Sequence, residues 1–227
     1  MSSIARVLAI ALLLGTALLG WGALLHPVLE GDSATQLRHI AATSSWRAVH
    51  LAMLAGSALV MLGIWVRLVC DSAGSAKALA PALGVITIGL AVSALNISFM
   101  AGSGWEMARL FQNGDASMAS LFDATHPIGL MAARFGNFII ALGALALGLL
   151  EWRDRSRSRL FAWLAWFAAI AGFAGVAFFD EASRFTVAAA ALLSGWQIAV
   201  GVQALASGAN KPAAGNQGPG ASRELVR

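Results

Sequence analysis

Six apolar runs of about 20 residues each constrain this chain more than any other feature of its sequence. A helix of ~20 residues spans the ~30 Å hydrocarbon core of a bilayer. The runs are continuous and lack the two-residue alternation of membrane-spanning strands. Because only helices and closed barrels satisfy their backbone groups in lipid, the sequence predicts an all-α membrane protein in contact with the lipid bilayer.

The predicted fold is a six-transmembrane-helix bundle that occupies residues 1–206. The helices are expected at residues 5–25, 46–69, 80–101, 127–150, 160–179 and 185–206. Composition agrees, because only 11% of the 227 residues are charged, about half the fraction typical of a soluble domain. Residues 207–227 are rich in Gly, Pro and Asn and are predicted to form a disordered tail.

The basic residues predict the orientation of the bundle. With the N-terminus inside, ten Lys and Arg residues fall on the inner side, whereas the outer loops hold four Arg and seven acidic residues. Because cytoplasmic loops carry the excess of Lys and Arg, both termini are predicted to be cytoplasmic. The arginine-rich, Ala- and Gly-rich composition suggests a bacterial inner membrane. The basic charge lies beside helix ends, so no nucleic-acid partner is expected.

Residues 5–69 and 80–150 form a candidate hairpin repeat, followed by residues 160–206. The segment GSALVMLG (56–63) aligns with GNFIIALG (136–143) at an offset of 80 residues. Short apolar alignments also arise by chance in membrane proteins. If the duplication is real, the two hairpins form a pseudo-symmetric bundle.

Within this alignment, Gly56 and Gly136 each end an A-x-x-x-G spacing, which lets neighbouring helix backbones approach closely. Each hairpin also has a long outer connection that contains an aspartate, Asp32 or Asp115. Either aspartate can cap a short amphipathic helix on the membrane surface. The sequence therefore predicts two such helices in the outer loops.

All four histidines are predicted to lie on the outer side of the membrane. His26 ends the first span, His39 lies in the first outer loop, His50 lies one turn into the second span, and His126 precedes Pro127 at the expected start of the fourth. Ionisable groups near a span usually face the bundle interior, and neutral imidazole binds metal ions and haem iron. We predict that His26, His50 and His126 line an outer-facing polar pocket that binds haem b or a metal ion. The alternative is that they are interfacial or packed side chains, and His39 is expected to be solvated.

The segment W-R-A-V-H adds two residues beside His50. Trp46 is expected in the aromatic belt at the interface, and Arg47 is expected to anchor the helix there. Arg47 is also a candidate partner for a haem propionate, because a guanidinium forms paired hydrogen bonds with a carboxylate.

Arg134 lies inside the fourth span, where a charge is costly. With Asn137 on nearly the same face and Asn96 on the third span, it is predicted to hold a carboxylate, a phosphate or another anion. The alternative is a buried ion pair with Glu106 or Asp123 that fixes helix packing.

Several methionines gather at the outer ends of the spans. Thioether and imidazole ligands together suit copper, although methionine is equally a common filler of helix contacts. They are Met53, Met100, Met107, Met118 and Met131.

Three functions remain open from the sequence. The first is a protein that binds haem or a metal ion in electron transfer. The second is a non-enzymatic assembly, anchoring or regulatory subunit that binds a membrane-protein partner through outer loops 26–45 and 102–125. The third is a small-solute transporter, or a membrane enzyme for an anionic or lipid-like substrate. The single cysteine, Cys70, excludes an intramolecular disulfide and a cysteine-cluster metal site.

Overall fold

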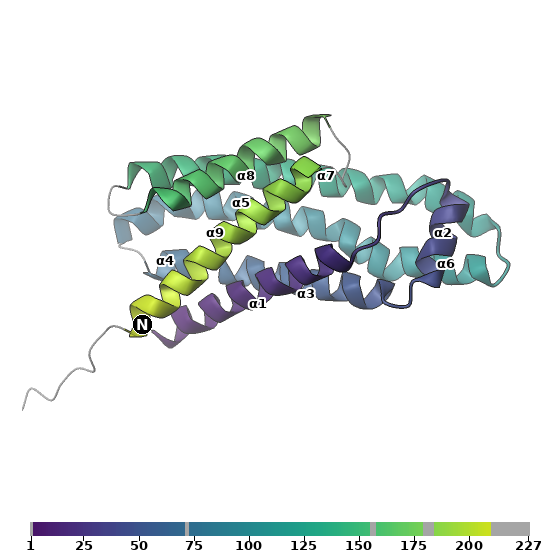
Figure 1. Cartoon of the computed structure of the whole chain (residues 1–227), viewed down its shortest axis with the longest axis horizontal. Helices are drawn as coiled ribbons and strands as arrows, with labels where there is room; N and C mark the ends of the chain where they lie inside the picture. The colour runs from purple at the N-terminus through teal and green to yellow at the C-terminus, as the bar shows by residue number, and fades with distance from the viewer. Residues whose placement is uncertain (1, 71–72, 155–157, 179–183, 210–227) are drawn as a thin grey trace, which may run out of the picture.

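The computed structural model describes residues 2–70, 73–154, 158–178 and 184–209, and it is helical nearly throughout (Figure 1). Six stretches of helix in this part of the chain are long and apolar enough to cross a membrane, so the predicted all-helical, polytopic class is confirmed. The helices are α1 (Ser3–Leu25), α2 (Ser33–Ala42), α3 (Trp46–Gly63), α4 (Val66–Cys70), α5 (Ala73–Phe99), the π-helix η1 (Met100–Gly104), α6 (Trp105–Gln112), α7 (Ser117–Arg153), α8 (Arg159–Phe178) and α9 (Arg184–Ala209). Residues 210–227 of the predicted tail lie outside the described residues.

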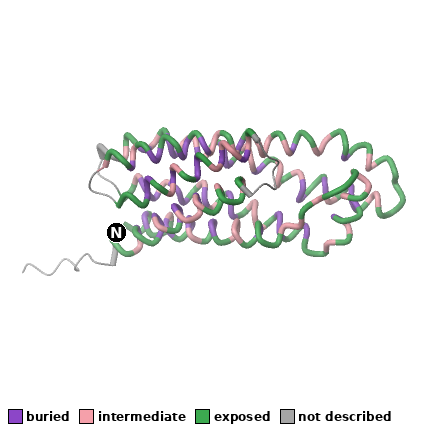
Figure 2. Tube along the Cα trace, turned by 45° about the horizontal axis from the view of Figure 1, so that its top comes forward, coloured by how far each residue is buried: buried purple, intermediate pink, exposed green. Residues whose placement is uncertain are grey.

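The six long helices form a closed ring. Neighbours pack in the order α1, α3, α5, α7, α8 and α9, and α9 returns to contact α1. Each helix contributes apolar side chains to one central core, among them Leu12, Val60, Leu83, Leu147, Ala165 and Trp196. Figure 2 shows buried residues along the inner faces of the helices and exposed residues along the outer faces. The exposed residues include many large apolar side chains, which suit contact with lipid.

The backbones of α1 and α3, and those of α5 and α7, come into direct contact at glycines, which have no side chain to separate them. A Cβ atom on Gly56 of α3 would lie 2.9 Å from the carbonyl oxygen of Gly15 on α1. A Cβ atom on Gly136 of α7 would lie 2.7 Å from the carbonyl oxygen of Gly89 on α5. The close approach expected at Gly56 and Gly136 is therefore confirmed, because neither contact leaves room for a side chain.

The register of these two helix pairs is equivalent over more than one turn. Gly63 of α3 faces Leu12 of α1, and Gly143 of α7 faces Ile86 of α5. The contact residues of α7 follow those of α3 by 80 residues, and the contact residues of α5 follow those of α1 by 74 residues. This equivalence supports the hairpin repeat, which stays a prediction.

The third span ends about ten residues later than predicted, and the fourth span begins about ten residues earlier. The helix that starts as α5 continues through η1 into α6 and ends at Gln112, and α7 begins at Ser117. The expectation that Pro127 starts a helix is wrong, because Pro127 lies inside α7. The side chain of Asp115 accepts hydrogen bonds from the Ser117 backbone N–H (3.1 Å) and hydroxyl (2.6 Å), and so fixes the start of α7 in place of Pro127. The expectation that Asp115 caps a separate short helix is therefore wrong.

α2, α6 and the first turns of α7 cover one end of the bundle, which we call the capped end (Figure 1). The Asp32 side chain caps α2 by accepting a hydrogen bond from the Thr35 backbone N–H at 2.8 Å. A second apolar cluster fills the space beneath α2, with Leu37, Ile40, Trp46, Met100, Met107, Ala108 and Phe122 as its buried members. α1 starts and α9 finishes at the opposite end, beside α4.

Candidate functional site

Two histidines from separate helices meet beneath the capped end. His26 directly follows α1 and His50 lies in the second turn of α3, and their Nε2 atoms are 3.1 Å apart. His26 leaves the helix because it precedes Pro27, and a residue before proline is pushed toward extended backbone (φ −71°, ψ 117°). The sequence thus ends α1 at the point where the His26 ring can reach α3.

The hydrogen bond of His50 to the helix backbone decides which of its nitrogens is available. Nδ1 of His50 lies 2.8 Å from the carbonyl oxygen of Trp46, one turn earlier in α3. Because a carbonyl only accepts, Nδ1 carries the proton and Nε2 of the neutral ring presents its lone pair to His26. The same type of hydrogen bond orients histidines that bind metal ions.

Trp46 forms one wall of the histidine pair. Its ring centroid lies 4.4 Å from that of His50 and 5.4 Å from that of His26. The expectation that Trp46 belongs to an interfacial belt is wrong, because the residue is fully buried and its Nε1 donates to the Met100 carbonyl oxygen at 3.1 Å. Met100 begins the π-helix η1, so Trp46 ties the histidine pair to an irregular turn of the third span.

His26 stays neutral over the physiological pH range. Its pKa is lowered from 6.5 to about 4, mainly by burial and also by the neighbouring His50, while a backbone hydrogen bond with Pro27 acts in the opposite direction. A neutral imidazole is the form that binds metal ions.

Met53 lies one turn deeper than the histidine pair, on the same seam between α1 and α3. A Cβ atom on Gly22 of α1 would fall 2.2 Å from Cγ and 3.2 Å from Sδ of Met53. Gly22 precedes His26 by one turn, and Met53 follows His50 by one turn. The Met53 side chain therefore occupies space that Gly22 leaves open. The sequence offered Met53 as one of five methionines that could bind copper, and the spacing H-x-x-M (50–53) was the signal that pairs it with His50.

The other predicted ligands lie elsewhere at the capped end. His126 is half-buried inside α7, not at its start, and stacks on Phe122 with ring centroids 4.5 Å apart. Arg47 is exposed in the first turn of α3. His39 is exposed on α2, as expected. The structure therefore brings together His26 and His50, and places His126 and Arg47 in separate surroundings.

The predicted anion-binding residues belong to α5 and α7. Asn137 accepts a hydrogen bond from Ser93 Oγ at 3.4 Å. Asn96 points its buried Oδ1 at Gly129, where an added Cβ atom would lie only 2.5 Å away. Arg134 is half-buried on α7, one turn before Asn137.

The two carboxylates predicted as partners of Arg134 have other contacts. Glu106 forms a salt bridge with Arg109, three residues later in α6. Asp123 accepts a hydrogen bond from Ser33 Oγ at 3.0 Å and so ties α2 to α7.

The opposite end holds a buried ion pair. Arg67 of α4 binds Glu151 of α7 through Nε (3.1 Å) and through Nη2, which lies 2.7 and 2.8 Å from the two carboxylate oxygens. The guanidinium also lies over the Phe161 ring, 5.4 Å from its centroid. Both charged residues are at least 95% buried.

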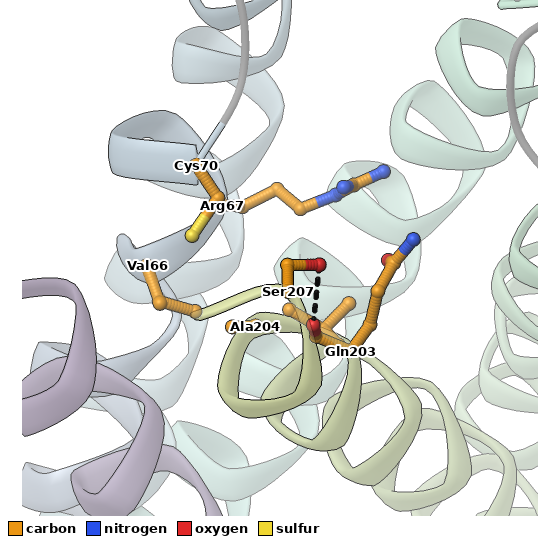
Figure 3. Close-up of a pocket in the computed structure, with 7 residues that line it drawn as sticks. Val66, Arg67, Cys70, Gln203, Ala204 and Ser207 are labelled. Atoms are coloured by element: carbon orange, nitrogen blue, oxygen red, sulfur yellow. Dashed lines mark hydrogen bonds between the residues drawn. The ribbon is translucent and has the colours of Figure 1, made fainter. Parts of the chain in front are cut away.

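Beside this pair is a small open cavity of about 100 Å³ between α4 and α9 (Figure 3). Figure 3 shows Arg67 and Gln203 on its sides, and the Ser207 hydroxyl donates to the Gln203 carbonyl oxygen at 2.8 Å. The guanidinium charge here is balanced by Glu151, so the cavity presents no free charge of Arg67 to a ligand.

The fold and these clusters define a polytopic membrane protein with a partly buried histidine pair near one end. Comparison with models of protein families, with curated proteins and with solved structures finds no match to the chain. Within the described residues, no three His, Cys, Asp or Glu side chains gather closely enough to hold a metal ion.

Proposed function

We propose that the protein binds a transition-metal ion at the capped end of the bundle, with Nε2 of His26 and Nε2 of His50 as ligands. The observation that carries this proposal is the 3.1 Å separation of these two atoms, which belong to different helices. His50 Nδ1 is already bonded to the Trp46 carbonyl oxygen, so its ring is oriented with the lone pair toward His26. In the metal-free protein, the His26 Nε2–H donates to this lone pair. Metal binding through Nε2 requires the proton to move to Nδ1 of His26, where the Pro27 backbone carbonyl can accept it, so that both imidazoles stay neutral.

The 3.1 Å distance between the two Nε2 atoms favours a bare ion over a haem. With metal–nitrogen bonds of about 2.0–2.1 Å, two ligands at a tetrahedral angle lie ~3.4 Å apart, whereas two ligands on opposite faces of a haem lie ~4 Å apart. The two imidazole rings are in direct edge contact, with centroids 4.8 Å apart. A porphyrin does not fit between rings in this arrangement.

We further propose that the capped end faces the outside of a bacterial inner membrane. Among the described side chains, five basic residues lie near the opposite end (Arg6, Arg67, Lys77, Arg153 and Arg159), against three at the capped end (Arg38, Arg47 and Arg109). The positive-inside rule favours this orientation. Partner binding through residues 26–45 and 102–125 stays a prediction.

Metal titration of the purified protein in detergent tests the proposed site. We expect one ion of Zn²⁺, Co²⁺ or Cu⁺ per chain. His26→Gln and His50→Gln should each lower the affinity on the order of 100-fold, because losing a group that only orients a metal ligand already costs about 10–100-fold. His39→Gln and His126→Gln are matched controls that leave the affinity unchanged. Equal binding by all four variants, or no binding by the wild-type protein, would contradict the proposal. A Soret absorbance band in the protein as purified would restore the haem alternative.

A further inference from the structure

We propose that the ion is Cu⁺ and that the thioether of Met53 is its third ligand. This inference rests on the proposed function, because it names the ion and completes the ligand set of the same histidine pair. It is carried by the position of Met53, one turn deeper than His50 on the seam that holds His26.

The seam between α1 and α3 is built so that Met53 faces the histidine pair. Gly22 has no side chain, and the Met53 Cγ fills the position that a Cβ atom there would occupy. Long helical side chains lean toward the N-terminus of their own helix. In α3 that direction leads from Met53 to His50, and the i, i+3 spacing places the two side chains on the same face of the helix.

The chemistry of this ligand set selects a soft ion. Within the described part of the chain, no third His, Cys, Asp or Glu side chain completes a site, so the oxygen ligands preferred by hard ions are missing from the set. Two neutral imidazoles and a thioether carry no charge, and thioether sulfur favours Cu⁺. Zinc sites instead use four ligands drawn from thiolate, imidazole and carboxylate groups or water.

The surroundings also suit a singly charged ion. Trp46 is fully buried and presents its ring to both histidines. The face of an indole ring attracts a cation and excludes water from that side. A single positive charge costs less to bury among neutral ligands than a double charge does.

Anaerobic competition with a chromophoric Cu⁺ chelator tests the inference on the purified full chain. The background variant is Cys70→Ala, because the exposed Cys70 thiol would otherwise compete for copper. We expect Met53→Leu, which keeps the side-chain volume and removes the sulfur, to weaken Cu⁺ binding by at least about tenfold. Met61→Leu, on the same helix but packed against the central core, is the matched control and leaves binding unchanged.

A second pair of variants tests the position of the Met53 side chain without removing a ligand. Gly22→Ala places a methyl group against Met53 and is expected to weaken Cu⁺ binding, whereas Gly20→Ala, which meets no atom within 4 Å, leaves it unchanged. Cu⁺ binding that is equal in Met53→Leu and wild-type protein, yet lost in His26→Gln, would overturn Met53 as a ligand and leave the histidine site standing. Cu⁺ binding that survives in His26→Gln and His50→Gln would overturn both proposals.

Discussion

At the scale of single residues, two pairs of polar side chains join segments that pack side by side. His50 of α3 meets His26 at the end of α1, and Arg67 of α4 meets Glu151 of α7. Unpaired groups of this kind would be costly in a bundle with an apolar core. The pairs therefore tie together helices that are far apart in sequence.

Removing one member of the Arg67–Glu151 pair is expected to destabilise the protein strongly. Glu151→Ala leaves a buried guanidinium without its carboxylate, and we expect a loss of about 3–5 kcal/mol in the free energy of unfolding. The double variant Arg67→Met, Glu151→Leu removes both charges and should lose less than either single variant. Thermal unfolding in detergent measures the stability of all three variants. A loss in the double variant equal to the sum of the two single losses would show that the two residues do not interact.

Stability of the metal-free protein is expected to depend on pH through His26. Its pKa is lowered from 6.5 to about 4 in the folded chain, so between these values the unfolded chain binds more protons than the folded one. Stability is then fully present above pH 6.5, falls as the pH drops toward 4, and levels off below. The melting temperature of His26→Gln should vary less over this range than that of His39→Gln, the exposed control. Equal slopes would show that His26 does not titrate in this way.

The sequence predicted part of the candidate site. An imidazole one turn into a span was recognisable as a functional candidate, and His26 and His50 do meet. That Trp46 turns inward was not recognisable, because a tryptophan at the end of an apolar run is typical of the interface. Arg67 and Glu151 were also indistinguishable from loop charges, since they are buried only by tertiary packing, with α4 against α1, α5 and α9 and the Arg67 side chain against Glu151 and Phe161.

At the scale of helices, close packing depends on glycines that face a neighbouring backbone. Gly136→Ala places a Cβ atom 2.5 Å from the Ser93 backbone nitrogen, so α5 and α7 must separate. We expect a loss of about 1–3 kcal/mol in unfolding free energy. Gly84→Ala on α5 is the control, because a Cβ there meets no atom within 4 Å, and it should be neutral or stabilising by up to ~1 kcal/mol. A Gly136→Ala protein as stable as the control would contradict the close contact.

Helix existence was predictable from the sequence, but helix limits were not. Apolar runs identify the membrane-spanning part of α7, whereas its first ten residues are polar enough to resemble a loop. They are helical because Asp115 fixes the start and because Phe122 packs into the cluster beneath α2. Such tertiary burial is invisible to a hydropathy pattern, and it outweighs the usual effect of a proline at position 127.

At the scale of the whole molecule, the ring of six helices has two chemically different ends. The capped end carries α2, α6 and the histidine pair, and the opposite end carries the Arg67–Glu151 pair and the cavity beside it. The proposed orientation places the capped end on the outer side of the membrane.

Cysteine labelling in intact cells tests this orientation in a Cys70→Ala background. Asn113 and Ser158 are both exposed, at the capped end and at the opposite end respectively. A membrane-impermeant maleimide is expected to label Asn113→Cys in intact cells and Ser158→Cys only after the membrane is opened. The reverse pattern would place the histidine pair on the inner side.

The most direct test of the metal site is nitrogen-15 NMR of the protein labelled only at histidine. The chain has four histidines, so each ring can be assigned by a His→Gln variant. We predict that one equivalent of Cu⁺ shifts the Nε2 signals of His26 and His50 and leaves those of His39 and His126 unchanged. Unshifted His26 and His50 signals under saturating Cu⁺ and Zn²⁺ would contradict the account.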